Sequence, residues 1–254
     1  MTVLHERFAF VECTTATEDD VLRCHTRELV EQVRTTRGFL DPDTICTETT
    51  FEAALLAAGA AIDAVRRNGF ALARPPGHHA ERNRAMGFCL FDSIAIAARW
   101  AQAELGIGRI AIVDWDVHHG NGTEDIVRED DSILFTSMHQ SPFYPGSGGP
   151  DDQGPTLLNV PLPAGTGDDG YLDAFRPVED AITRFEPELV LVSAGFDAHV
   201  DDPLADMRVT ADGFRELARR SAQLAPRVAA VLEGGYNLNT LPDLVEAAVE
   251  GFCL

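Results

Sequence analysis

Residues 114–122, with the sequence DWDVHHGNG, place two carboxylates and two histidines within six residues. They follow the apolar run RIAIV, which is typical of a buried strand. Alternate side chains of a strand share one face, so we expect Asp116 and His118 to point the same way and to reach one cation. Histidine nitrogen and aspartate oxygen are ligands of catalytic zinc, which takes three protein ligands and leaves a position for water. The spacing predicts two of those three ligands.

A third ligand is expected in the stretch FDAHVDDP, which follows the apolar run LVLVSAG. Its carboxylate and imidazole groups compete for this role: Asp197, His199, Asp201 and Asp202. The residues alone leave the choice among them open.

Two further groups suit acid–base chemistry beside a metal. His78 and His79 follow PPG; an isolated pair of this kind is often a turn, but imidazole also titrates near neutral pH and suits a general base. Asp114 is available to orient one of these rings. Tyr236 follows EGG and could donate a hydrogen bond to an oxygen that becomes negative during the reaction. The set predicts hydrolysis at a carbonyl group.

Apolar runs that alternate with helix-like segments must position these residues. The strand-like runs lie at 70–73, 109–113, 132–138, 189–195 and 228–235. The helix-like segments lie at 51–69, 91–106, 170–185 and 211–225, and short Pro/Gly-rich loops are expected at 75–77, 142–150 and 161–170. Strands that are apolar throughout predict a mainly parallel sheet with helices on both faces, a three-layer α/β/α fold. We expect one domain over residues 1–254.

Polar side chains follow all five strand-like runs. The histidines found there are His78, His79, His118, His119 and His139. Ligands of such folds bind at the carboxyl ends of the strands, so this edge of the sheet is the expected site.

The sequence is strongly acidic. It has 41 Asp and Glu against 20 basic residues, all of them Arg, and a formal net charge of −21. Such a surface repels nucleic acid and anionic membranes, so we expect neither as a partner. The charge could attract a cationic substrate, or could simply keep the protein soluble in a salt-rich cytoplasm, as in an acidic proteome.

Cysteine usage and the N-terminus predict a location. The five cysteines are odd in number and lack metal-type spacing, which indicates reduced thiols. No apolar stretch approaches the roughly 18 residues of a membrane span, and the N-terminus shows no secretory signal pattern. We therefore expect a soluble, cytoplasmic protein of a prokaryote.

Five motifs resemble the zinc-dependent histone deacetylases and acetylpolyamine amidohydrolases of the arginase/deacetylase fold, most closely the class II-like prokaryotic members. The motifs are RPPGHHAERNRAMGFCLFDSIAIAA, IAIVDWDVHHGNGTEDI, TSMHQSPFYPGSG, LVSAGFDAHVDDPLADMRVT and LEGGYNL. The resemblance covers nearly the whole chain from about residue 15 onward. It implies hydrolysis of acylated amines, with acetyl-lysine in proteins as the expected substrate and acetylpolyamines as the alternative.

The resemblance assigns roles to the site residues. It implies that one zinc ion binds to Asp116, His118 and Asp202. His79 is then the general base, His78 an electrostatic partner or acid, and Asp114 supports His78. Where some members have a second carboxylate behind the other histidine, this sequence has Asn121, and Tyr236 resembles the tyrosine that stabilises the transition state.

The resemblance also implies a substrate channel and a second cation. Its channel residues are Gly87, Phe88 and Tyr144, with Asp43 as a carboxylate at the rim. A structural potassium ion would bind main-chain oxygens of Asp114, Asp116 and His118 together with Ser137 and Met138. The oligomeric state stays open.

Two departures from the family pattern stand out. The usual N-terminal strand and its loop, which carries a His-Pro-Glu-Arg-type motif, have no counterpart upstream of TTATEDDVLRCHT. We expect an N-terminally short domain with an exposed sheet edge and part of one entrance wall lost. Asp92 stands where Asn is more frequent, with a modest expected effect.

Two other function classes share parts of this pattern. A ureohydrolase of the same fold holds two manganese ions and needs a carboxylate two residues beyond the strand histidine, where this sequence has Gly120. A non-catalytic protein that binds acylated amines would follow if the short N-terminus abolished turnover. The intact histidine pair and Tyr236 favour an enzyme.

Overall fold

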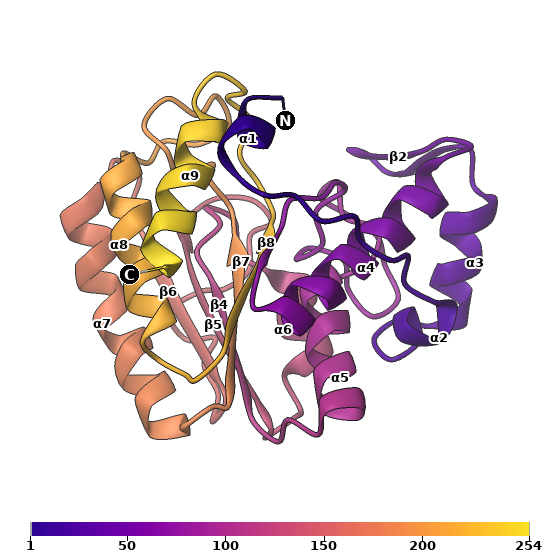
Figure 1. Ribbon diagram of the computed structural model, residues 1–254, viewed down its shortest axis with the longest axis horizontal. Helices are drawn as coiled ribbons and strands as arrows, with labels where there is room; N and C mark the ends of the chain where they lie inside the picture. Colours follow the sequence, from indigo (N-terminus) through magenta and orange to yellow (C-terminus); the bar gives the residue numbers. More distant parts are fainter. Residues whose placement is uncertain (1, 254) are drawn as a thin grey trace.

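A computed structural model describes residues 2–253, so the two end residues of the expected domain 1–254 lie outside the described part. Its central feature is a sheet of six parallel strands in the order β3-β8-β7-β4-β5-β6 (Figure 1). These strands are β3 (Phe70–Ala71), β4 (Ile110–Asp114), β5 (Ile133–Gln140), β6 (Leu157–Leu162), β7 (Leu189–Ala194) and β8 (Val228–Leu232). A separate antiparallel hairpin is formed by β1 (Gly38–Asp41) and β2 (Thr44–Cys46).

Helices lie on both faces of the sheet. In Figure 1, α7, α8 and α9 cover one face, whereas α4, α5 and α6 lie on the other. The described helices are α1 (Thr2–Arg7), α2 (Glu18–Val21), α3 (Arg27–Thr35), α4 (Thr50–Arg67), α5 (Ser93–Leu105), α6 (Asn121–Val127), α7 (Asp168–Phe185), α8 (Ala211–Ala222) and α9 (Leu241–Phe252). The expected three-layer fold with a mainly parallel sheet is confirmed.

The strands are apolar throughout because successive side chains enter two different cores. In β4, Ile110 and Ile112 pack with residues of α4 and α5, whereas Ala111 and Val113 pack with residues of α7, α8 and α9. The same alternation occurs in β7 and β8. A strand with helices on both faces has no solvent-facing side, so polar residues are confined to its ends.

The direction in which successive strands are added across the sheet reverses after β4. From β4 it adds β5 and β6 on one side, and it then returns to place β7 on the other side of β4. The crevice at the carboxyl ends of β4 and β7 is therefore a topological switch point, where ligands bind in open α/β sheets. The loops after these two strands contain the expected metal ligands.

Several elements differ from the sequence expectations. The loop expected at 161–170 is shorter, because its first residues end β6 and its last residues begin α7. Pro161 lies within β6, where it is tolerated because β6 is an edge strand. The helix α9 and the β1–β2 hairpin were not predicted from the sequence.

The first 50 residues lie outside the alternating part of the fold. The helix α1 packs beside α9, where Arg7 contacts Asp243 and Glu246. The segment that follows crosses to α2 and α3 on the far side of α4 (Figure 1). Among the described strands, β3 pairs only with β8 and forms one edge of the sheet.

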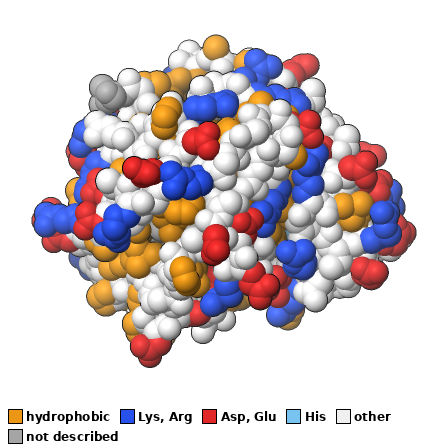
Figure 2. All heavy atoms as spheres, turned by 90° about the horizontal axis from the view of Figure 1, so that it is seen from below, with side chains coloured by type: hydrophobic (Ala, Val, Ile, Leu, Met, Phe, Trp, Pro, Cys, Tyr) orange, Lys and Arg blue, Asp and Glu red, His pale blue; other side chains and the backbone are white. Residues whose placement is uncertain are grey.

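The charged surface is mixed in sign. On the face shown in Figure 2, arginine and acidic side chains lie among one another and do not separate into one basic and one acidic region. Within residues 2–253, the helices are all too short or too polar to cross a membrane.

Candidate active site

The loop after β4 is shaped by its own aspartates. Asp114 Oδ1 accepts a hydrogen bond from the backbone N–H of Asp116 (3.0 Å), and Asp116 Oδ1 accepts one from the N–H of His118 (2.9 Å). β4 ends at Asp114, so Asp116 and His118 share a direction through these successive Asx turns. The expectation that strand alternation aligns them was wrong, although the two side chains do meet.

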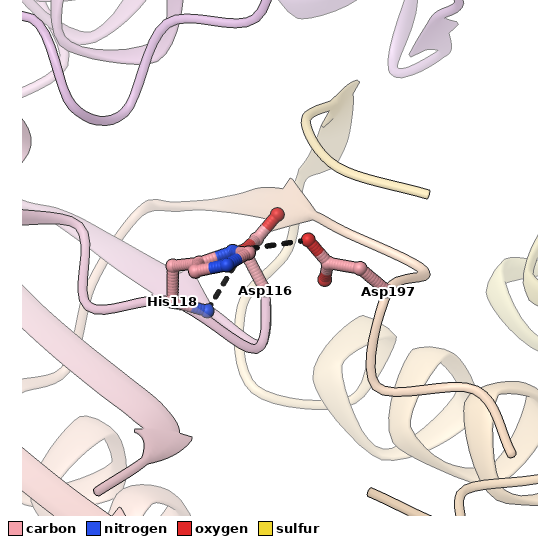
Figure 3. Close-up of side chains that lie close together, drawn as sticks. All are labelled: Asp116, His118 and Asp197. Atoms are coloured by element: carbon pink, nitrogen blue, oxygen red, sulfur yellow. Dashed lines mark hydrogen bonds and ion pairs between the residues drawn. The ribbon is translucent and has the colours of Figure 1, made fainter. Parts of the chain in front are cut away.

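A buried group of three side chains could hold a metal ion. Asp116, His118 and Asp197 offer ligand atoms that all lie within 4.8 Å of one another (Figure 3). His118 Nδ1 lies 3.0 Å from Asp116 Oδ1 and 3.1 Å from Asp197 Oδ2. Asp197 Oδ2 is buried, and its contact with His118 is an ion pair without good hydrogen-bond geometry among the described residues. A buried carboxylate oxygen beside an imidazole, with no hydrogen-bond donor aimed at it, fits a divalent cation.

Asp202 lies in the same loop but outside this group of three. Its Oδ2 accepts a hydrogen bond from the Tyr236 N–H (2.7 Å) and its Oδ1 accepts one from the Leu204 N–H (2.9 Å). The side chain is buried. The structure therefore links Asp202 to the tyrosine, while Asp197 lies beside His118.

Glycines let the carboxylates approach the strands. A Cβ on Gly195 would lie 2.1 Å from Asp116 Oδ2, and one on Gly234 would lie 2.0 Å from Asp197 Oδ2. The Gly234 N–H donates to Asp116 Oδ2 (2.8 Å). The EGG motif thus has a direct role at the site, since any side chain there would displace the acidic group.

The charges in this group stabilise one another. Burial opposes protonation of His118, but its interactions with the carboxylates of Asp116 and Asp197 outweigh it and raise its pKa to about 10. Burial, followed by the charge of Asp116, raises the pKa of Asp197 to about 6. For Asp116, burial is outweighed by the charge of His78 and by His118, so its pKa is lowered. A dication would replace the proton on His118 as the partner of these carboxylates.

His78 is paired with Asp114. His78 Nδ1 lies 2.9 Å from Asp114 Oδ2, and both side chains are buried. A Cβ on Gly120 would lie 2.2 Å from the same Asp114 oxygen. A carboxylate at position 120 therefore does not fit without movement of Asp114.

His79 has a neutral partner. Its Nδ1 lies 2.8 Å from Asn121 Oδ1, and its ring centroid lies 4.0 Å from that of His78. Burial, then the charge of His78, lowers the pKa of His79 well below its usual value. Burial also acts on His78, but Asp116 and Asp114 outweigh it and raise its pKa well above the usual value. The pKa values of the two adjacent histidines are thus shifted in opposite directions, upward for His78 and downward for His79.

The expected channel residues lie around the histidines and the tyrosine. Phe88 packs against Tyr236, with ring centroids 6.0 Å apart, and Tyr144 lies 5.2 Å from the ring of His79. Phe88 and Tyr144 are both partly exposed. Burial raises the pKa of Tyr236, which keeps its hydroxyl a hydrogen-bond donor.

Gly87 and Asp43 connect the channel to the β1–β2 hairpin. A Cβ on Gly87 would lie 2.4 Å from the His79 ring, and Gly87 has a φ of +58°. The Gly87 N–H donates to Asp43 Oδ1 (3.1 Å). The rim carboxylate expected at 43 therefore lies beside the channel backbone.

Two residues with contacts to the site were not singled out from the sequence. Phe143 stacks on the ring of His118, with centroids 5.1 Å apart. Glu233 is fully buried, and its Oε2 accepts hydrogen bonds from the N–H groups of Gly77 (2.6 Å) and His78 (3.2 Å). Their only sequence signals are a second aromatic beside Tyr144 and an acidic residue at the end of an apolar strand.

Three of the residues expected to bind potassium lie close together where β4 ends beside β5. Asp114 of β4 is in register with Ser137 of β5, and Met138 follows in β5. These residues are buried. The potassium site stays a prediction.

Known proteins resemble this chain over nearly its whole length. The family model described as histone deacetylase domain matches residues 2–252. A probable deacetylase of Archaeoglobus fulgidus is 41% identical, over 98% of this chain and 76% of the relative. A histone deacetylase-like amidohydrolase of Pseudomonas aeruginosa is 40% identical, over 92% of this chain and 68% of the relative. Histone deacetylase 14, chloroplastic, of Arabidopsis thaliana is 46% identical over 80% of this chain. Because this relative is named as chloroplastic, the cytoplasmic location of the present chain stays a prediction.

A solved structure has the same fold. The crystal structure of the HDA15 HD domain superimposes with a TM-score of 0.91 at 39% identity, over 94% of this chain and 74% of that chain. The chain therefore belongs to the histone deacetylase family, and it is a hydrolase of the deacetylase type.

Proposed function

We propose that this protein removes acetyl groups from acylated amines by zinc-dependent amide hydrolysis, with acetyl-lysine in proteins as its substrate. The observation that carries the proposal is the meeting of the Asp116–His118–Asp197 group with two adjacent histidines that have different partners, Asp114 for His78 and Asn121 for His79. Amide hydrolysis needs a polarised carbonyl, a base for water and an acid for the leaving amine. The site offers candidates for each task.

Asp116 and His118 are the proposed metal ligands, and Asp202 is the proposed third, as the family resemblance implies. Asp197 competes with Asp202 for the third ligand position, because Asp197 Oδ2 lies 3.1 Å from His118 Nδ1. A bound zinc ion would supply the positive charge that polarises the acyl oxygen and eases the deprotonation of water.

The protein's own residues perform the proton transfers. Neutral His79 takes a proton from water, and charged His78, which Asp114 holds in place, gives a proton to the leaving amine. The Tyr236 hydroxyl donates a hydrogen bond to the oxygen that becomes negative. Acetate and a free amine are the products.

The channel supports a slender substrate stem. Phe88, Tyr144 and Gly87 surround the approach to His79, and the Asp43 carboxylate at the rim would bind the substrate backbone. A structural potassium ion at the ends of β4 and β5 belongs to the same proposal. The alternative substrate is an acetylpolyamine. The net charge of −21 does not separate the two substrates, because it would attract either cationic product.

Turnover on an acetyl-lysine peptide and on an acetylpolyamine, with zinc content measured in parallel, tests the proposal. We expect one zinc per chain and faster hydrolysis of the peptide. Asp202→Asn and Asp197→Asn are matched variants, and we expect the larger loss of zinc from Asp202→Asn. Zinc binding without any turnover would instead favour a non-catalytic protein that binds acylated amines.

A further inference from the structure

The neutral partner of His79 is itself held by a carboxylate. Asn121 Oδ1 faces His79 Nδ1 at 2.8 Å, while Asn121 Nδ2 donates to Glu81 Oε1 at 2.9 Å. The sulfur of Met86 lies 3.4 Å from the same Nδ2. The nitrogen end of the amide thus faces two acceptors, and its oxygen end faces the histidine.

An amide has two orientations, and only one suits a general base. A carboxylate only accepts hydrogen bonds, so Glu81 requires the NH₂ end of Asn121 on its side. The Asn121 oxygen must then accept from His79, which requires the His79 proton on Nδ1. In a neutral imidazole this leaves the lone pair on Nε2, on the side of the ring away from Asn121. If the amide turned round, His79 would carry its proton on Nε2 and could not accept another there.

Backbone contacts hold Glu81 and Asn121 at a fixed separation. Glu81 lies in a bridge with Arg84, and its carbonyl accepts from His25 Nδ1 (3.0 Å). Asn121 begins α6, where the next residue, Gly122, donates its N–H to the carbonyl of His78 (2.9 Å). These contacts attach both ends of the Glu81–Asn121 hydrogen bond to the fold, and the contact at the Asn121 end is with the loop that contains the histidine pair.

We propose that Glu81 is a positioning residue of the deacetylase: it fixes the orientation of the Asn121 amide and thereby the tautomer of His79. The inference rests on the proposed role of His79 as general base. Glu81 itself contacts neither substrate nor metal ligand in this scheme.

A double-mutant cycle tests the proposal. Glu81→Ala frees the Asn121 amide, and we expect kcat to fall about tenfold, the value of a hydrogen bond to a charged group. Glu81→Gln should recover part of this loss, because its amide oxygen still accepts from Asn121. In an Asn121→Asp background, an oxygen faces His79 in either orientation, so adding Glu81→Ala should cost nothing and should relieve repulsion between two carboxylates.

A merely structural role gives a different pattern. If Glu81 only supported its loop, Glu81→Ala would lower kcat equally in both backgrounds, and the proposal would be overturned. Zinc content and unfolding midpoint, measured on every variant, separate misfolding from loss of positioning.

A second measurement does not depend on turnover. The ring ¹⁵N signals of His79, assigned by their loss in His79→Ala, should show a protonated Nδ1 in the wild type and a mixture of tautomers in Glu81→Ala. An inactive wild type with this tautomer pattern would contradict the proposed function but not the positioning role. An unchanged pattern in Glu81→Ala would contradict the positioning role alone.

Discussion

Individual residues acquire distinct tasks at this site from their partners. His78 and His79 are neighbours in sequence, yet one faces the carboxylate of Asp114 and the other the amide of Asn121. The pKa values shift in opposite directions because the carboxylates of Asp116 and Asp114 stabilise an imidazolium at His78, whereas burial and the charge of His78 oppose one at His79. In the proposed mechanism, acid and base are thereby separated within two consecutive residues.

The hydroxyl of Tyr236 is the group whose removal tests the mechanism most directly. Tyr236→Phe keeps the ring contact with Phe88 and removes only the donor, so we expect turnover to fall by about 10²–10³-fold, the usual effect of losing one oxyanion donor. Steady-state kinetics on an acetyl-lysine peptide measures this. Tyr171→Phe is the matched control, because its buried hydroxyl has no hydrogen-bond partner among the described residues. Equal rates in Tyr236→Phe and wild type would remove the tyrosine from the mechanism.

Among the elements, the loop after β5 depends on two histidines that take no part in the proposed chemistry. His119 Nδ1 lies 2.8 Å from Ser147 Oγ, and His139 Nε2 donates to the carbonyl of Gly148 (2.8 Å). This loop carries Phe143 and Tyr144, which contact the rings of His118 and His79. Fixing the loop therefore fixes one wall of the channel.

Gly148 provides a test of this loop. It has a φ of +74°, and an added Cβ would lie 2.6 Å from both His119 and His139. We expect Gly148→Ala to displace the loop, to lower kcat/KM at least about tenfold and to destabilise the fold by about 1–3 kcal/mol. Gly146→Ala is the matched control, because Gly146 also has a positive φ (+94°) and nothing lies within 4 Å of its Cβ position. If kinetics and thermal unfolding show the same effect for both variants, the contact with the histidines is not the cause.

At the scale of the whole molecule, His25 connects the N-terminal part to the catalytic half. His25 Nδ1 donates to the carbonyl of Glu81, and His25 Nε2 accepts from the N–H of Asp92 at the start of α5 (2.8 Å). Asp92 in turn accepts from Ala95 and Thr123. The segment that precedes the alternating fold is thus attached to the loop that contains the histidine pair.

This connection makes stability depend on pH. Burial lowers the pKa of His25 from 6.5 to about 4, so the unfolded chain takes up a proton before the folded one does. The contribution of His25 to the free energy of unfolding is therefore full above about pH 6.5 and falls as the pH drops toward 4, by about 3 kcal/mol in all. We expect His25→Gln to reduce this loss, as measured by urea unfolding at pH 7.5 and pH 4.5. Parallel losses in wild type and variant would show that other groups govern the acid sensitivity.

The layered fold, and the expectation that the polar residues gather at one edge of its sheet, follow from the amino-acid sequence alone. Runs such as IAIV and LVLV are apolar on both faces, and only a sheet covered on both sides accommodates them. The polar residues that follow these runs then had to meet at one edge. β6 was not predicted from the sequence, because Asn159 and Pro161 interrupt its apolar pattern; an edge strand tolerates both residues.

Only the tertiary structure decided which partners the site residues have. Asp197 and Asp202 lie five residues apart in one loop, and nothing local shows that the first lies beside His118 while the second is held by the backbone of Tyr236. Glu81 and Asn121 lie forty residues apart, and their contact depends on how α6 docks against the histidine loop. Residue types are fixed by the chain, whereas hydrogen-bond partners, protonation and tautomer depend on contacts between segments that only the folded molecule brings together.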